Sequence, residues 1–253
     1  LTTGSKFQDA SKYYHVDGNY NFGHLTDVAE IQVGGSFRKY KLNSFGTIYT
    51  DTEANGPIDY SEVGFYTQVQ KKFLEQDRLK LTASLRYDKS ELFDGFFSPR
   101  LSLGYTAGAT QSHNFRGSVQ TGFRNPTTQD QYIGLNAGRA YLVGSAPDNL
   151  DRYQTNPLSV SGLGQNFTGG ATTIKVSGRS AYENSFSYSS VTNGTFQKAN
   201  IALVKPEKVT AYEVGYRGLI PTGGARIAVD LSVYYNAYED FIAGKNVVVP
   251  FYG

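Results

Sequence analysis

Residues 115–124 alternate between two kinds of side chain along the chain. One parity holds Phe115, Gly117, Val119, Thr121 and Phe123, and the other holds Arg116, Ser118, Gln120, Gly122 and Arg124. Because successive side chains of a strand point to opposite faces, this pattern predicts a β-strand with one apolar and one charged face. Asn125-Pro126 ends the strand, since proline donates no backbone hydrogen bond and restricts the residue before it. A polar excursion to about residue 206 follows.

Seven further stretches alternate in the same way, and the connections between them differ in length. The stretches are 13–23, 29–40, 61–73, 78–88, 98–106, 209–218 and 226–236. Short connections at 23–28, 74–78, 107–114 and 218–225 alternate with longer ones at 43–61, 89–97 and 125–206. Short turns at one rim and long loops at the other are typical of outer-membrane barrels. We therefore expect an all-β fold: about eight antiparallel transmembrane strands of a partial barrel, with short periplasmic turns and long extracellular loops.

The composition excludes several other classes of protein. No apolar run reaches the roughly 18 residues of a membrane-spanning helix, whereas a membrane strand needs only about 9 to 11. The net charge of +2, from 24 basic and 22 acidic residues, gives no electrostatic basis for binding nucleic acid. The absence of cysteine excludes disulfides and thiolate metal sites. His15, His24 and His113 are isolated, and no catalytic or phosphate-binding motif is present. We expect no enzymatic activity, no metal and no cofactor.

A soluble β-sandwich is the main alternative at this point, because its apolar parity would face a core. The opposite parity, however, carries arginines and carboxylates among Gln, Ser, Thr and Gly, with few of the lysines that coat a water-exposed sheet. That composition favours a polar lumen and hence a membrane barrel surrounded by lipid.

Several segments, in this order, resemble the C-terminal barrel of TonB-dependent outer-membrane receptors of Gram-negative bacteria. They are GFYTQVQKKF, LKLTASLRYDKSE, FFSPRLSLGYT, FRGSVQTGFRNPTTQDQY, KPEKVTAYEVGYRG and DLSVYYNAYEDFI. The resemblance covers most of the chain outside 133–204, and Asn125 in GFRNPT is a variation on the family pattern. It implies import of a scarce nutrient such as a siderophore, glycan or peptide, in the outer membrane. It also implies TonB as partner through an N-terminal part, and allows a capping surface lipoprotein.

The family pattern also implies a barrel of about 22 strands that is filled by a separate N-terminal plug domain. This chain departs from that pattern, because it shows about eight strands, no plug and no TonB-contacting segment. We therefore expect residues 1–253 to be a portion of a larger barrel. A complete eight-stranded barrel acting as an adhesin or structural protein stays open, as does a soluble carbohydrate-binding β protein.

Two groups of residues are candidates for function. The lumen-facing or plug-contacting candidates are Arg86, Arg100, Arg116, Arg124, Glu213, Arg217 and Asp230. They form either a cationic wall that guides an acidic substrate or structural pairs with plug carboxylates and with neighbours such as Glu62. The aromatic candidates of the long loop 125–206 are Tyr132, Tyr141, Tyr153, Phe167, Tyr182 and Tyr188. These either contact a ligand or partner protein, or pack on one another to close the barrel mouth.

Overall fold

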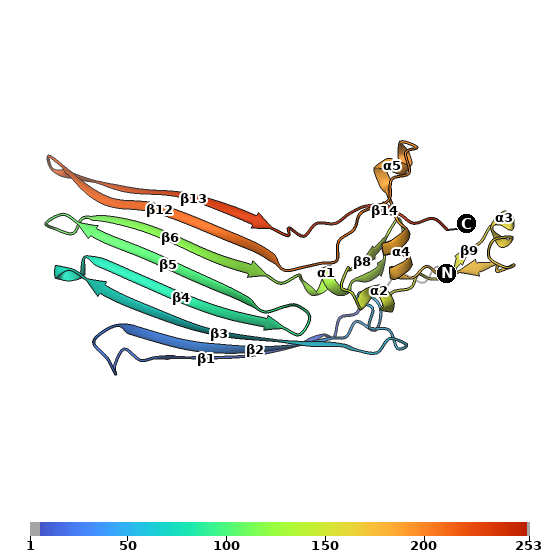
Figure 1. Cartoon of the computed structure of the whole chain (residues 1–253), viewed down its shortest axis with the longest axis horizontal. Coiled ribbons are helices and arrows are strands. Elements are labelled where there is room, and N and C mark those ends of the chain that lie inside the picture. The colour runs from blue at the N-terminus through green and yellow to red at the C-terminus, as the bar shows by residue number, and fades with distance from the viewer. Residues whose placement is uncertain (1–5, 252–253) are drawn as a thin grey trace.

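The computed structural model describes residues 6–251, and its main element is a sheet of eight antiparallel strands (Figure 1). The strands are β1 (Lys12–Asn21), β2 (Glu30–Leu42), β3 (Ile58–Phe73), β4 (Leu79–Ser90), β5 (Phe96–Ala107), β6 (His113–Arg124), β12 (Glu207–Thr222) and β13 (Ala225–Glu239). They lie in the order β1-β2-β3-β4-β5-β6-β12-β13. All eight predicted strands are present, and the expected all-β antiparallel fold is confirmed.

The burial of the two faces of the sheet is the reverse of that in a soluble protein, because the apolar side chains are the exposed ones. On β3, Tyr60 and Gly64 of the polar parity are buried, whereas Phe65 and Val69 of the apolar parity are 62% and 39% exposed. On β5, Leu101 and Leu103 of the apolar parity are likewise 48% and 46% exposed. We call these surfaces the polar face and the apolar face. No element among the described residues covers the apolar face, so the alternation does not serve an internal core.

The predicted alternation in length holds for 43–57 and 125–206 but not for 91–95, which is no longer than the turn 74–78 because β4 and β5 extend further than expected. Figure 1 shows one set of connections together at the left end of the sheet. They are residues 22–29, 74–78, 108–112 and 223–224, and the second contains the 3-10 helix η1 (Glu75–Asp77). The other connections, 43–57, 91–95 and 125–206, lie at the opposite end. We call these the turn end and the loop end.

The predicted turn at 218–225 is wrong in extent, because β12 continues to Thr222 and only Gly223 and Gly224 form the turn. Pro221 lies within the strand. Beyond Gly218, β12 no longer pairs with β6 and pairs only with β13. A strand with one free side tolerates proline, since the missing N–H is not needed for a second ladder.

The sheet is open rather than closed. Within residues 6–251, β1 pairs only with β2 and β13 only with β12, so the first and last strands are its two edges. The alternative of a complete eight-stranded barrel is therefore wrong, because closure requires these two strands to pair.

The excursion at 125–206 is folded into short elements. They are α1 (Thr128–Tyr132), β7 (Gly134–Asn136), β8 (Tyr141–Val143), α2 (Asn149–Arg152), β9 (Leu158–Ser159), α3 (Gly162–Gln165), β10 (Thr173–Ile174), α4 (Gly178–Asn184), β11 (Phe186–Ser187) and α5 (Tyr188–Thr192). β11 pairs with β14 (Val247–Val248) beyond the last sheet strand. Across the described range, no helix is long and apolar enough to cross a membrane.

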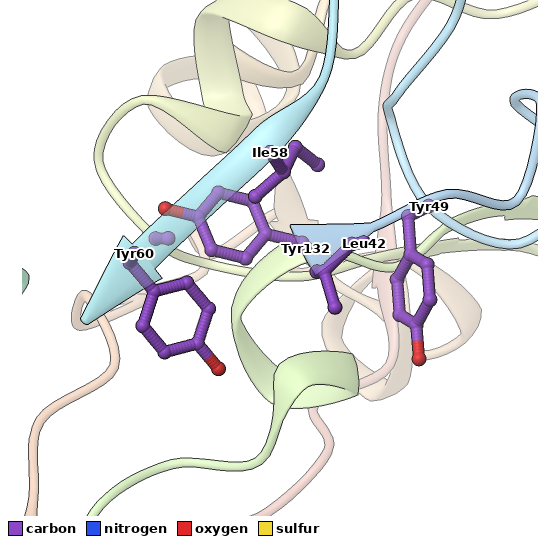
Figure 2. Close-up of a cluster of buried hydrophobic side chains, with 6 residues drawn as sticks. Leu42, Tyr49, Ile58, Tyr60 and Tyr132 are labelled. Carbon is purple, nitrogen blue, oxygen red and sulfur yellow. The ribbon is translucent and has the colours of Figure 1, made fainter. Parts of the chain in front are cut away.

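A small aromatic core joins the excursion to the sheet. It consists of Leu42, Tyr49, Ile58, Tyr60, Tyr132 and Ala146, at the loop ends of β2 and β3, in the 43–57 connection and in the excursion. Figure 2 shows the Tyr132 ring beside Ile58 and Tyr60, and the Tyr60 and Tyr132 ring centroids are 6.3 Å apart. The hydrophobic core thus lies at the loop end of the sheet.

Candidate binding site at the loop end of the polar face

A hollow of about 470 Å³ opens on the polar face where the strands meet the excursion. Side chains of β2, β3, β4 and β6 line it, together with the residues that lead into α1. We call it the polar-face pocket. Of the predicted lumen residues it contains Arg86 and Arg124.

Glu62 of β3 is the acceptor at the centre of this pocket. Asn125 Nδ2 donates to Glu62 Oε1 at 2.6 Å, and the Tyr40 hydroxyl donates to Oε2 at 3.3 Å. Arg38 Nη1 lies 3.6 Å from the same Oε2 atom. Asn125, the departure from the family pattern, therefore ties the start of the excursion to β3.

An ion pair with Asp88 fixes the side chain of Arg86 in the lining of the pocket. It forms two hydrogen bonds to Asp88, Nε to Oδ2 and Nη2 to Oδ1, both at 2.6 Å. A Cβ at Gly64 on the adjacent strand would lie 2.5 Å from both Arg86 Nη2 and Asp88 Oδ1. Glycine at this position leaves the space that the ion pair occupies.

The lining of the polar-face pocket carries an excess of positive charge. Its cations of the polar parity are Arg38, Arg86 and Arg124 and its carboxylates are Glu62 and Asp88, so three positive and two negative charges leave +1. Lys89 also borders the pocket but lies on the apolar parity of β4, and its Nζ donates to the Phe93 carbonyl at 2.7 Å. Arg124 also pairs with Glu207 at 2.8 Å, a residue outside the lining. The buried Nε of Arg38 has no hydrogen-bond partner among residues 6–251. The pocket is therefore suited to a ligand that carries negative charge and accepts hydrogen bonds.

The remaining lumen candidates lie nearer the middle and turn end of the sheet. Arg116 reaches Glu213 at 3.3 Å and Asp230 at 3.5 Å, and it donates to Ser232 Oγ at 2.5 Å. Arg217 lies 3.4 Å from Asp230. These contacts match the structural interpretation of the inward charges. Arg100 has no ion pair in the described part of the chain.

Arg116 can cross β12 only because Gly215 lies beneath it. A Cβ at Gly215 would come within 2.6 Å of the Arg116 Nε and Cζ atoms. The guanidinium therefore lies over the backbone of β12 and reaches β13 beyond it.

The six aromatic loop candidates do not form one cluster. Tyr132 is only 2% exposed and its ring packs in the core, which matches the packing alternative for this residue. Tyr182 is half-buried in α4, whereas Phe167 and Tyr188 are exposed in separate parts of the excursion. Tyr141 and Tyr153 come together in a second hollow of about 310 Å³. We call it the outer pocket; the connection 43–57, β7, Tyr141 and residues after α2 line it.

Sequence reasoning did not single out Tyr40, Asp88 or Lys89 in the polar-face pocket. Tyr40 and Asp88 lie on the polar parity of their strands, and this alternation is the sequence pattern that could have identified them as pocket residues. For metal binding, residues 6–251 contain no group of three or more His, Asp or Glu side chains placed to hold an ion.

Comparison with known proteins identifies the family. The model of the family described as "TonB dependent receptor-like, beta-barrel" matches residues 1–253. No curated protein sequence matches the chain.

Solved structures with a similar fold include three siderophore receptors, each about 15% identical to the chain. The receptor PirA from Pseudomonas aeruginosa superposes with a TM-score of 0.53 at 15% identity, over 90% of this chain and 31% of PirA. PirA from Acinetobacter baumannii gives 0.51 at 14%, over 94% and 28%. The ferric enterobactin receptor PfeA from P. aeruginosa gives 0.52 at 15%, over 90% and 27%. The chain thus spans less than a third of each receptor. It belongs to the TonB-dependent receptor β-barrel family.

Proposed function

We propose that this chain forms part of the barrel wall and an extracellular loop of a non-enzymatic importer in the outer membrane of a Gram-negative bacterium. Further strands of the same receptor pair with the free edges of β1 and β13. A plug domain fills the lumen on the polar face, and TonB acts through a segment outside this sequence. Family membership and the open sheet support this assignment.

The exposed apolar face supports the membrane location. Residues such as Phe65, Leu101 and Leu231 are 62%, 48% and 61% exposed near the middle of their strands. Exposing apolar surface to water costs about 25 cal/mol of free energy per Å², so this face is unfavourable in water. Contact with lipid removes that cost.

The polar-face pocket is the observation that carries the ligand assignment. Its polar-parity lining holds a net +1 charge and lies at the loop end, where a ligand from outside the cell arrives first. We infer that the ligand is an anionic, oxygen-rich iron chelate of the siderophore class. The siderophore receptors with a similar fold support this class.

Removal of pocket charges tests the ligand assignment. In the complete receptor, Arg38→Gln and Arg124→Gln should each weaken binding of an anionic ferric siderophore about tenfold or more, since each removes a charge-assisted contact. Arg226→Gln makes the same charge change at the turn end of β13 and serves as the control. Equal affinity of all three variants and the unmodified receptor would overturn the assignment of this pocket.

The intact mass of the polypeptide tests the proposal that the receptor is larger. Under denaturing conditions, the protein from its native membranes should have a mass far above the 27.8 kDa of these residues. A mass near 27.8 kDa would contradict both the additional strands and the plug.

A further inference from the structure

Three lysines of β1 and β2 lie on the apolar face at its loop end, directly beyond the apolar side chains. Taken toward the loop end, the cross-strand pairs on this face are Val16 with Phe37, Tyr14 with Lys39, and Lys12 with Lys41. Successive pairs are about 7 Å apart, at a rise of about 3.4 Å per residue. The face thus changes from apolar through aromatic to cationic. We call Lys12, Lys39 and Lys41 the loop-end lysines.

The loop-end lysines lack the carboxylate partners that arginines of the polar face have. Arg38, next to Lys39 but on the polar face, lies 3.6 Å from Glu62. Within residues 6–251, none of the three lysines forms an ion pair. Asp59 of β3 is the register partner of Lys41. On this face at the loop end of β1–β3, three lysines and this one aspartate leave a net charge of +2.

Two of these lysines, Lys12 and Lys41, are direct cross-strand neighbours. The Cβ atoms of such neighbours are about 4.5–5.5 Å apart, and like charges at this separation destabilise a sheet. A second opposed pair, Lys72 with Lys80, receives an anion from the protein, since Lys72 Nζ lies 3.1 Å from Asp77. An anion near Lys12 and Lys41 would likewise turn repulsion into attraction.

The turn end of the same two strands is free of basic residues. Residues 13–37 contain no lysine or arginine, and Ile31 and Val33 continue the apolar parity toward the turn end. The cations of this hairpin therefore gather at one rim. A lysine stem can lie along apolar surface while its ammonium group reaches the headgroup layer. Tyr14, at the level of Lys39, is the kind of residue found at that boundary.

From this arrangement we propose that the loop-end lysines bind the phosphate of an anionic lipid headgroup in the outward-facing leaflet. The acyl chains lie along Val16 and Phe37, and the phosphate oxygens accept hydrogen bonds from the lysine ammonium groups. This inference rests on the proposed membrane location and adds a specific lipid site to it. The site lies on the opposite face of the sheet from the polar-face pocket, so lipid and imported ligand do not compete.

Lipid binding to the complete receptor in an uncharged detergent tests the proposal. The probes are phosphatidylglycerol, phosphatidylcholine with the same acyl chains, and inorganic phosphate, and native mass spectrometry measures the bound lipid. We expect phosphatidylglycerol to bind more tightly than phosphatidylcholine, and inorganic phosphate not to displace it. Lys39→Gln and Lys41→Gln should each weaken phosphatidylglycerol binding about fivefold, the usual effect of one lysine at an anionic membrane surface.

Two control variants show whether the effect belongs to this site. Lys71→Gln removes a lysine from the apolar parity of β3 at the turn end, where its Nζ lies 5.4 Å from the Phe73 ring centroid, and should change the affinity far less. Lys39→Arg keeps the charge and should keep the affinity. The proposal is overturned if phosphatidylcholine binds equally well, if inorganic phosphate displaces the lipid, or if Lys71→Gln is as harmful as Lys39→Gln.

Assembly of the same variants in lipid vesicles separates this proposal from the proposed function. All of them retain the apolar residues of the face and should assemble like the unmodified receptor. A receptor that assembles in vesicles and binds a ferric siderophore, yet shows no preference for phosphatidylglycerol, would overturn the lipid site alone. Failure of the unmodified receptor to assemble would instead contradict the membrane location on which the lipid site rests.

Discussion

At the residue scale, the most informative contact is the one between Asn125 and Glu62. The two are 63 positions apart in the chain, yet their side chains are 2.6 Å apart. Glu62 is only 14% exposed, so its carboxylate depends on Asn125, Tyr40 and Arg38 to replace the water that it has lost. The same three groups depend on Glu62 as their acceptor.

Removal of this carboxylate should destabilise the loop end. Glu62→Ala leaves the three donors without their shared acceptor, and we expect a loss of about 1–3 kcal/mol in the free energy of unfolding. Glu62→Gln keeps an acceptor and should lose less. Denaturant unfolding in detergent measures both, and Glu53→Ala, at an exposed position of the 43–57 connection, is the control. An unchanged unfolding midpoint in Glu62→Ala would contradict the central role of Glu62.

The raised pKa of Tyr153 predicts that the excursion loses stability at alkaline pH. Burial raises the pKa of its phenol from 10.0 to about 12, because desolvation disfavours the phenolate. A raised pKa stabilises the fold below pH 10, and this contribution is lost as the pH rises from 10 through about 12. Tyrosinate absorbance and hydrogen exchange should therefore show the excursion loosening in this window. Tyr153→Phe should reduce that loosening, whereas Tyr188→Phe, which removes an exposed phenol, should not.

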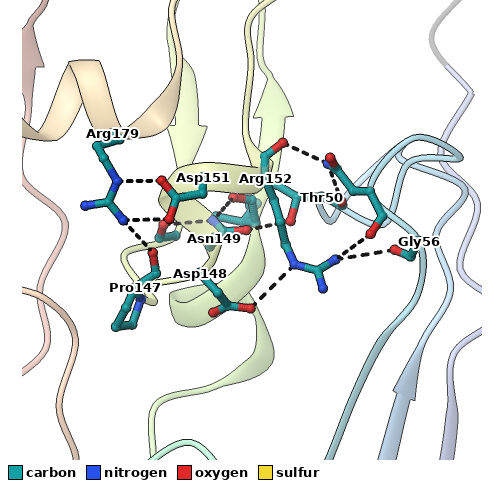
Figure 3. A network of polar contacts seen from close by, with 11 residues as sticks. Thr50, Gly56, Pro147, Asp148, Asn149, Asp151, Arg152 and Arg179 are labelled. Carbon is teal, nitrogen blue, oxygen red and sulfur yellow. Dashed lines mark hydrogen bonds and ion pairs between the residues drawn. The ribbon is translucent and has the colours of Figure 1, made fainter.

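At the element scale, one buried amide is among the groups that anchor the excursion to the connection 43–57. Asn149 of α2 is fully buried; its Nδ2 donates to the Gly144 carbonyl at 2.8 Å and to the Ile133 carbonyl at 3.2 Å. Its Oδ1 accepts from the Thr50 hydroxyl at 2.6 Å (Figure 3). One side chain thus connects the residues beside β7 and β8 to the 43–57 connection.

Loss of this amide should release the excursion while the sheet stays intact. Asn149→Ala leaves the Thr50 hydroxyl and the Gly144 carbonyl without this partner, at a cost of about 1–3 kcal/mol for a buried polar group. The Ile133 carbonyl still accepts from the Gly144 N–H at 2.9 Å. Hydrogen exchange should rise in residues 43–57 and 133–153 but remain slow in β3 and β4. Asn200→Ala, an exposed amide of the same excursion, should leave exchange unchanged. Uniform acceleration across the sheet would show instead that the excursion and the sheet unfold together.

The sequence predicted the sheet strands well because their two-residue period runs over about ten residues each. It did not predict the helices of the excursion, since elements of four to seven residues are too short to display a helical period. The polar-face pocket was found only in part. Arg86 and Arg124 were visible from parity, whereas the contacts of Asn125 and Tyr40 with Glu62 depend on strand register and on the path of the excursion.

At the scale of the whole molecule, the polar face of the sheet lies toward the proposed lumen and the apolar face toward the proposed lipid. Charged side chains are held against the sheet by pairing, as Arg116 is with Glu213 and Asp230. Large apolar side chains on the other face, such as Phe65 and Leu231, are 62% and 61% exposed. This inverted arrangement explains why mean hydropathy is only −0.40 in a chain that we place in a membrane.

Two adjacent positions on β5 test this arrangement. Leu101 lies on the apolar face and Ser102 on the polar face, both at the middle of the strand. Leu101→Arg should impair membrane assembly by about 2–4 kcal/mol, because it places a charge near the bilayer midplane. Ser102→Arg adds the same side chain one residue away, on the face that already holds arginines, and should assemble almost normally. Folding yield in lipid vesicles measures both variants, and equal assembly would show that the two faces are assigned incorrectly.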